Sequence, residues 1–97
     1  MSRRIALEAG VRALAPRIPK HELEAVVYHA LDSPGLRTAF PEGAAWLSLV
    51  AYVRHVVTDY DALLADGYDQ DSARFFVVGD IDEVLAGWGA TRRVGED

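Results

Sequence analysis

The sequence contains no cysteine, a single methionine and a single lysine, and it has no long apolar run. The lack of cysteine excludes disulfides and thiolate metal sites. No stretch approaches the roughly 18 apolar residues that a membrane span needs, so we expect no membrane insertion. The first ten residues, MSRRIALEAG, lack the continuous apolar core and cleavage site of an export signal. The sequence therefore predicts a cytoplasmic protein.

The length and the charge place further limits on the class of protein. The 97 residues suffice for one domain with a modest core, so we expect a single domain over residues 1–97. The net charge of −5 argues against a surface that binds phosphate backbones. The charge is uneven, because residues 1–20 hold five basic residues and one acidic, whereas residues 59–83 hold eight acidic and one basic. Nine of the ten basic residues are arginine, which is typical of a GC-rich genome and needs no functional cause.

Apolar residues recur with a helical period along most of the chain, and this predicts an all-α bundle of four helices. The helices are expected over residues 3–15, 20–32, 41–65 and 70–88. The third is the longest, roughly 37 Å at 1.5 Å per residue, and is expected to be the central element of the fold. In the fourth, residues 75–78 also fit a short strand, but no second strand pattern exists to pair with it. Residues 90–97 are expected to form a flexible tail.

The stretch AYVRHVVTDYD, residues 51–61, carries the densest group of polar side chains. On one continuous helix its polar residues fall on one side, and Tyr60 falls with the core. The residues of that polar side are Ser48, Arg54, His55, Thr58, Asp59, Asp61 and Asp66. Arg74 lies at the centre of the apolar face of the fourth helix, where an unpaired guanidinium is costly. We therefore predict a partly buried ion pair between Arg74 and Asp61, part of a structural brace with Tyr60.

The same residues resemble a bacterial and fungal family known as domain of unknown function 2293. The pattern is A-h-R-H-x-x-T-x-Y-D-x-L-L, then A-R and a closing Trp. It maps onto Arg54, His55, Thr58, Tyr60, Asp61, Leu63, Leu64, Ala73, Arg74 and Trp88, and the upstream HALDSPGL of residues 29–36 also fits. The resemblance covers about residues 20–89. It implies no activity, but it singles out these polar residues over Asp59, Ser48 and His21.

Arg54 and His55 are the two residues of this group that a structural brace explains least. Side by side on one face, they suit an anionic group or a carboxylate of a partner. The sequence therefore favours a non-catalytic binding or interaction module that uses Arg54, His55 and Thr58, without a cofactor, for a protein partner or a small anionic ligand.

Three other hypotheses stay open. The first is a small enzyme, with or without a bound metal ion, in which His55 acts with Asp59 or His29. The second is a nucleic-acid-binding accessory domain, for which seven basic residues would converge on one face: Arg3, Arg4, Arg12, Arg17, Lys20, Arg37 and Arg54. The third concerns self-association, because Phe75 and Phe76 lie off the apolar stripe of their helix and suit a homodimer interface.

Overall fold

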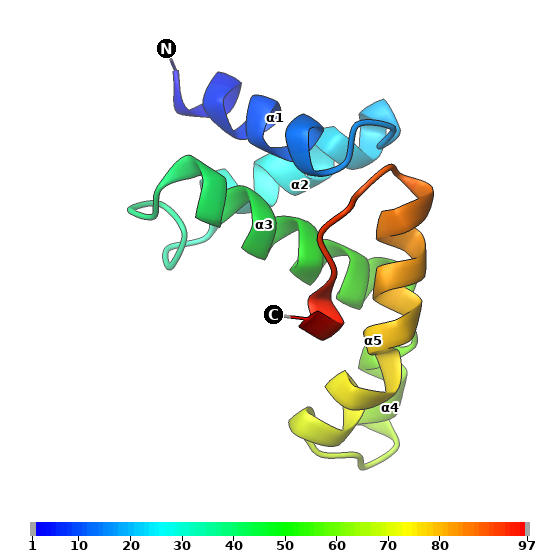
Figure 1. Cartoon of the computed structure of the whole chain (residues 1–97). Coiled ribbons are helices and arrows are strands. Elements are labelled where there is room, and N and C mark those ends of the chain that lie inside the picture. The colour runs from blue at the N-terminus through cyan, green and yellow to red at the C-terminus, as the bar shows by residue number, and fades with distance from the viewer. Residues whose placement is uncertain (1, 97) are drawn as a thin grey trace.

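The computed structural model describes residues 2–96, which form helices joined by short connections and contain no strand (Figure 1). In chain order these residues form α1 (Arg3–Leu14), α2 (Lys20–Asp32), α3 (Pro41–Tyr52), the π-helical turn η1 (Val53–Val57), α4 (Tyr60–Ala65), α5 (Gln70–Gly87) and the 3₁₀ turn η2 (Val94–Glu96). The predicted all-α bundle is confirmed. None of the helices in this part of the chain is long and apolar enough to cross a membrane.

The first three helices pack on one another and supply most of the hydrophobic core. Figure 1 shows α1 above α3, with α2 behind them. α1 and α3 approach closely at Gly10, where an added Cβ would lie 3.1 Å from the Cβ of Ala45. Ser48, expected on a polar face, is instead buried, and its hydroxyl donates a 2.7 Å hydrogen bond to the carbonyl of Val26. The side of α3 that carries Ser48 is therefore buried as well.

The third helix is not continuous, so the prediction of one helix over residues 41–65 is wrong. α3 ends at Tyr52, η1 widens the helix over the next five residues, and Thr58 is extended at φ −114° and ψ 173° before α4 begins at Tyr60. The Thr58 hydroxyl donates to the carbonyl of Arg54 and accepts from the N–H of Tyr60. A threonine that bonds back to the carbonyl four residues earlier bends a helix, which accounts for the break.

α4 and α5 form a helical hairpin that projects from the α1–α3 layer (Figure 1). The turn between them uses Gly67 at φ 101°, a conformation that suits glycine. Asp69 caps α5, because its carboxylate accepts the N–H of Ser72 at 2.7 Å. Residues 70–87 are helical throughout, so the strand alternative for residues 75–78 does not occur.

The chain after α5 folds back onto the bundle. The N–H of Arg17 donates to the carbonyl of Trp88 at 2.8 Å, and Gly89 fits at φ 89° against Pro16. Residues 90–95 then run between α3 and α5 (Figure 1). The guanidinium carbon of Arg92 lies 4.1 Å from the centre of the Trp46 ring. Residues 90–95 of the predicted flexible tail thus contact the bundle, and residue 97 lies outside the described residues. The mobility of this segment stays a prediction.

Candidate functional site

The polar residues of the RHxxTxYD motif gather around the break between α3 and α4. Arg54 and His55 belong to η1, Thr58 makes the bend, and Tyr60 and Asp61 start α4. π-Helical turns of this kind occur often at functional sites because they redirect side chains out of the regular helical positions. The break therefore gives these five residues a geometry that a straight helix would not provide.

Tyr60 forms the base of this group. Its side chain is 2% exposed, as expected from its position with the core. The His55 ring stands edge-on to it with centroids 5.2 Å apart. The guanidinium carbon of Arg54 lies 5.7 Å from its ring centre, within the range of a cation–π contact. One buried ring therefore positions both of the residues that the sequence singled out for binding.

His55 is paired with Asp61 across the break. Its Nδ1 lies 2.7 Å from Oδ1 of Asp61, so the imidazole N–H donates to the carboxylate. About half of each side chain is exposed, at 51% for His55 and 62% for Asp61. Histidines that act as general bases are often oriented by a carboxylate in this way. In the enzyme hypothesis the residue that orients His55 would therefore be Asp61 and not Asp59.

The predicted ion pair between Arg74 and Asp61 does not form. Arg74 is exposed and makes no ion pair with any residue in the range 2–96, while Asp61 is bonded to His55. Arg74 lies on the same face of α5 as Ile81 and Leu85. The segment that approaches Arg74 is η1, which carries Arg54, and not the start of α4, which carries Asp61. The prediction of this ion pair was wrong because it treats the third helix as straight, whereas the break brings Asp61 next to His55.

The neighbour of Arg74 is a second arginine, Arg54. Burial lowers the pKa of Arg54, and the positive charge of Arg74 lowers this pKa further. Nε of Arg54 is buried and has no hydrogen-bond partner in the described part of the chain. The two guanidinium charges therefore lie near enough to repel each other, and neither forms an ion pair with a carboxylate of residues 2–96, an arrangement that favours a bound anion.

The alternative metal ligands do not come together. His29 is exposed on α2, and Asp59 is exposed at the start of α4 while His55 turns to Asp61. Across residues 2–96, no three histidine or carboxylate side chains are grouped closely enough to hold a metal ion. The set His29, His55 and Asp59 is therefore not a site in this fold.

Two of the basic residues of the nucleic-acid hypothesis have polar partners within the chain. Arg3 donates through one terminal nitrogen to the carbonyls of Leu36 and Ala39, which closes the loop before α3. Arg4 pairs with Glu8 one turn along α1 at 3.9 Å. These contacts give both arginines structural roles, which weakens the case for a convergent basic face.

Phe75 and Phe76 are exposed, at 76% and 56%, as the homodimer hypothesis requires. Their rings contact each other edge-on at 5.8 Å, and Phe76 also meets Tyr68 at 5.4 Å. The self-association of this surface stays a prediction.

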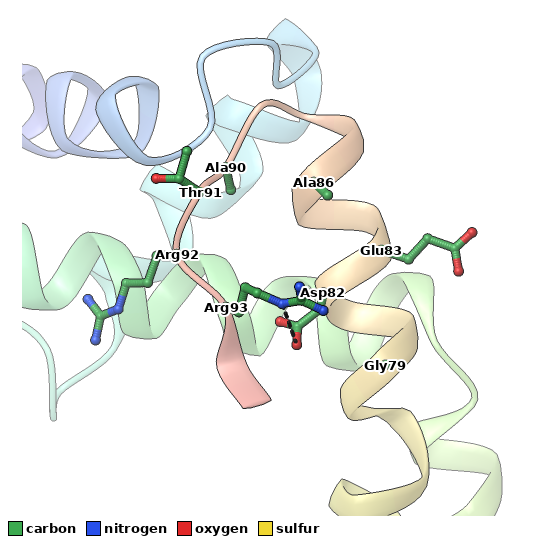
Figure 2. A pocket seen from close by; sticks show the side chains of 8 residues that line it. All are labelled: Gly79, Asp82, Glu83, Ala86, Ala90, Thr91, Arg92 and Arg93. Atoms are coloured by element: carbon green, nitrogen blue, oxygen red, sulfur yellow. Dashed lines mark ion pairs between the residues drawn. The ribbon is translucent and has the colours of Figure 1, made fainter. Parts of the chain in front are cut away.

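A pocket of about 290 Å³ lies between α5 and the C-terminal segment (Figure 2). Its lining comes from Gly79, Asp82, Glu83, Ala86, Ala90, Thr91, Arg92 and Arg93. Figure 2 shows Arg93 directed at Asp82, which lies 3.9 Å away, whereas Arg92 points away from the pocket and Glu83 points outward. Asp82 is only 8% exposed and accepts the N–H groups of Val94 and Gly95. The polar groups here hold the C-terminal segment in place.

The fold and the motif define a small all-α protein whose polar residues gather at a break between two helices. The family model of the uncharacterized conserved proteins DUF2293 matches residues 10–89, so the chain belongs to this family. The comparisons with curated proteins and with solved structures gave no match.

Proposed function

We propose that this chain is a non-catalytic binding module, and that the face formed by Arg54, His55 and Arg74 recognises a carboxylate or phosphate group. That group belongs to a partner protein or to a small anionic ligand. The observation that carries the proposal is the closeness of two arginines, neither of which has an ion-pair partner within residues 2–96. An anion at the terminal nitrogens of the two guanidinium groups would relieve this repulsion.

The surrounding residues support this assignment because they hold Arg54 and the imidazole of His55 in place. Tyr60 lies against Arg54 and His55, and Asp61 holds Nδ1 of His55, which leaves Nε2 for a ligand. Thr58 contributes through the backbone, since its hydroxyl bonds to the Arg54 carbonyl. Arginine suits such a site because its planar guanidinium can donate two parallel hydrogen bonds to one carboxylate or phosphate.

An NMR titration tests the proposal. The ¹⁵N-labelled chain is titrated at constant ionic strength with sodium phosphate and, separately, with the acidic peptide Ac-Gly-Asp-Glu-Asp-Gly-NH₂. We expect saturable amide shifts confined to η1, the start of α4 and the first two turns of α5. Arg54→Gln and Arg74→Gln should each raise the Kd about tenfold, the loss of about 1.4 kcal/mol that one charge-assisted hydrogen bond supplies.

Arg37→Gln is the matched control, because Arg37 is exposed in the loop before α3 and the variant loses the same charge. It should change the Kd by less than about twofold, as a distant surface charge is screened by salt. An equal loss of affinity in Arg37→Gln, or shifts spread over all the arginines, would show general attraction to a cation and would contradict the proposed site.

A further inference from the structure

A second candidate site lies on another face of the α4–α5 hairpin. Phe76 follows Arg74 by two residues on α5, which places it about 200° around the helix from that arginine. A groove of about 230 Å³ opens beside Phe76, and it is lined by Asp59, Leu63, Tyr68, Phe76, Val77 and Asp80. This volume is below the roughly 300 Å³ at which small-molecule pockets begin, so it suits one long side chain.

The floor of the groove is apolar and partly aromatic. Tyr68 and Phe76 stand edge to face, with ring centroids 5.4 Å apart and an interplanar angle of 81°. Both are well exposed, at 45% and 56%, although each has a large apolar surface that water solvates poorly. Two exposed aromatic rings in contact beside a groove are typical of a binding surface.

The rim of the groove is negative. Asp59 and Asp80 are both exposed, and neither makes an ion pair with another residue of the described chain. The surrounding segment strengthens this field, because residues 59–83 hold eight acidic residues against Arg74 alone. The groove therefore joins an aromatic floor to two carboxylates that have no cation of their own.

We propose that this groove binds a lysine or arginine side chain presented by a different polypeptide. The methylene stem of that side chain covers Phe76 and Tyr68, and its cationic head lies between Asp59 and Asp80. Long basic side chains bind in this way because their stems are apolar while their heads favour carboxylates and aromatic faces. The charge complementarity selects a basic partner segment, whereas the Arg54–Arg74 face selects an acidic group.

Three synthetic peptides test the proposal on the full chain by NMR titration. Ac-Gly-Ala-Lys-Ala-Gly-NH₂ carries the stem and the cation, its norleucine analogue keeps the stem alone, and its glutamate analogue reverses the charge. We expect the lysine peptide to shift the resonances of Tyr68, Phe76 and Val77. The norleucine and glutamate peptides should bind at least about fivefold more weakly, since a cation near carboxylates and aromatic rings contributes about 1 kcal/mol or more.

Two double variants separate the groove from the general negative charge of the hairpin. Asp59→Asn with Asp80→Asn should raise the Kd for the lysine peptide about tenfold. Asp66→Asn with Asp71→Asn removes the same charge from exposed positions outside the groove and should raise it by less than about twofold. Equal losses in both double variants would overturn the proposal.

Analytical ultracentrifugation distinguishes the other occupant, a second copy of the chain. A Phe76→Ala variant should leave the sedimentation coefficient unchanged while it weakens binding of the lysine peptide about fivefold. A concentration-dependent dimer that Phe76→Ala abolishes would assign the aromatic surface to self-association and would overturn the proposal.

Discussion

His55 and Asp61 are six residues apart, yet Nδ1 of one lies 2.7 Å from Oδ1 of the other. On an unbroken α-helix these side chains would lie about 120° apart around the axis and about 9 Å apart along it. Their hydrogen bond therefore depends on the break between α3 and α4. The buried Tyr60 and Arg54, which feels the charge of Arg74, lie on either side of the same break.

The His55–Asp61 pair should contribute little to stability despite its short distance. Both side chains are about half exposed, and ion pairs at that exposure contribute between about 0 and 1 kcal/mol. In a double-mutant cycle of His55→Ala and Asp61→Ala, urea unfolding should give a coupling energy below about 1 kcal/mol. A coupling above about 2 kcal/mol would mean that the pair is a structural requirement of the bend.

Thr58 should matter more, because its hydroxyl makes both hydrogen bonds that define the bend. Thr58→Val keeps the β-branched shape and removes the hydroxyl. We expect the free energy of unfolding to fall by about 1–2 kcal/mol, measured by urea denaturation. Thr38→Val, at an exposed loop position, is the control and should change it by less than about 0.5 kcal/mol. Equal effects at the two positions would remove the proposed cause of the break.

Tyr60 should be the most sensitive residue of the site. Its ring is fully buried beneath His55 and Arg54, so Tyr60→Ala leaves a cavity and should cost about 3–5 kcal/mol. Tyr60→Phe keeps the ring and should cost less than about 1.5 kcal/mol. Thermal unfolding of the two variants measures the difference. A Tyr60→Ala chain as stable as Tyr60→Phe would contradict the position of this ring.

Asp82 should hold the C-terminal segment against the bundle. It is buried and accepts the N–H of Val94 at 2.6 Å and that of Gly95 at 3.2 Å. Asp82→Asn weakens these charge-assisted bonds and should lower the free energy of unfolding by about 1.5–3 kcal/mol. Hydrogen exchange should accelerate at the amides of Val94 and Gly95. Glu83→Gln, at an exposed position on α5, should leave both amides protected, and faster exchange there would contradict the assignment.

Asp69 gives a pH dependence of known sign. The hydrogen bond from the Ser72 backbone N–H, followed by the Ser72 side chain, lowers the pKa of Asp69 in the folded state. The stabilisation is therefore complete above the ordinary aspartate pKa of about 3.9 and is lost as the pH falls through the lower folded-state value. Asp69→Ser keeps a capping oxygen without the charge, so its unfolding midpoint should depend less on pH in that window. An unchanged pH profile would exclude this role.

The ends of most helices follow from local chemistry that is readable in the sequence. Pro16 and Pro19 end α1, the run Ser33-Pro34-Gly35 ends α2, and the predicted ranges 20–32 and 70–88 match α2 and α5 within one residue. The break was not predicted, because the apolar period continues through residues 53–64 without glycine or proline. A threonine inside such a pattern signals either an exposed helical position or a back-bonded bend, and only the fold distinguishes them.

The candidate site could be predicted in part for the same reason. The sequence placed Tyr60 in the core and singled out Arg54 and His55, because both inferences need only the residue types and their positions around one helix. It assigned Asp61 to Arg74, because that pairing depends on the path of the chain after Val57. The closeness of Arg54 to Arg74 joins segments twenty residues apart, so helical periodicity alone carried no signal for it.

The most direct test of the proposed anion site measures the NMR signal of the Arg54 side chain. Its Nε belongs to the guanidinium that the anion would bind and has no hydrogen-bond partner in the described chain, so binding should change the electronic environment of that N–H. In a ¹⁵N–¹H NMR titration with sodium phosphate at constant ionic strength, we expect a saturable downfield shift of the Arg54 Nε–H proton. The shift should persist in Arg37→Gln and disappear in Arg74→Gln. An Arg54 Nε–H signal that does not respond to phosphate or to the acidic peptide would contradict an anion-binding site at Arg54 and Arg74.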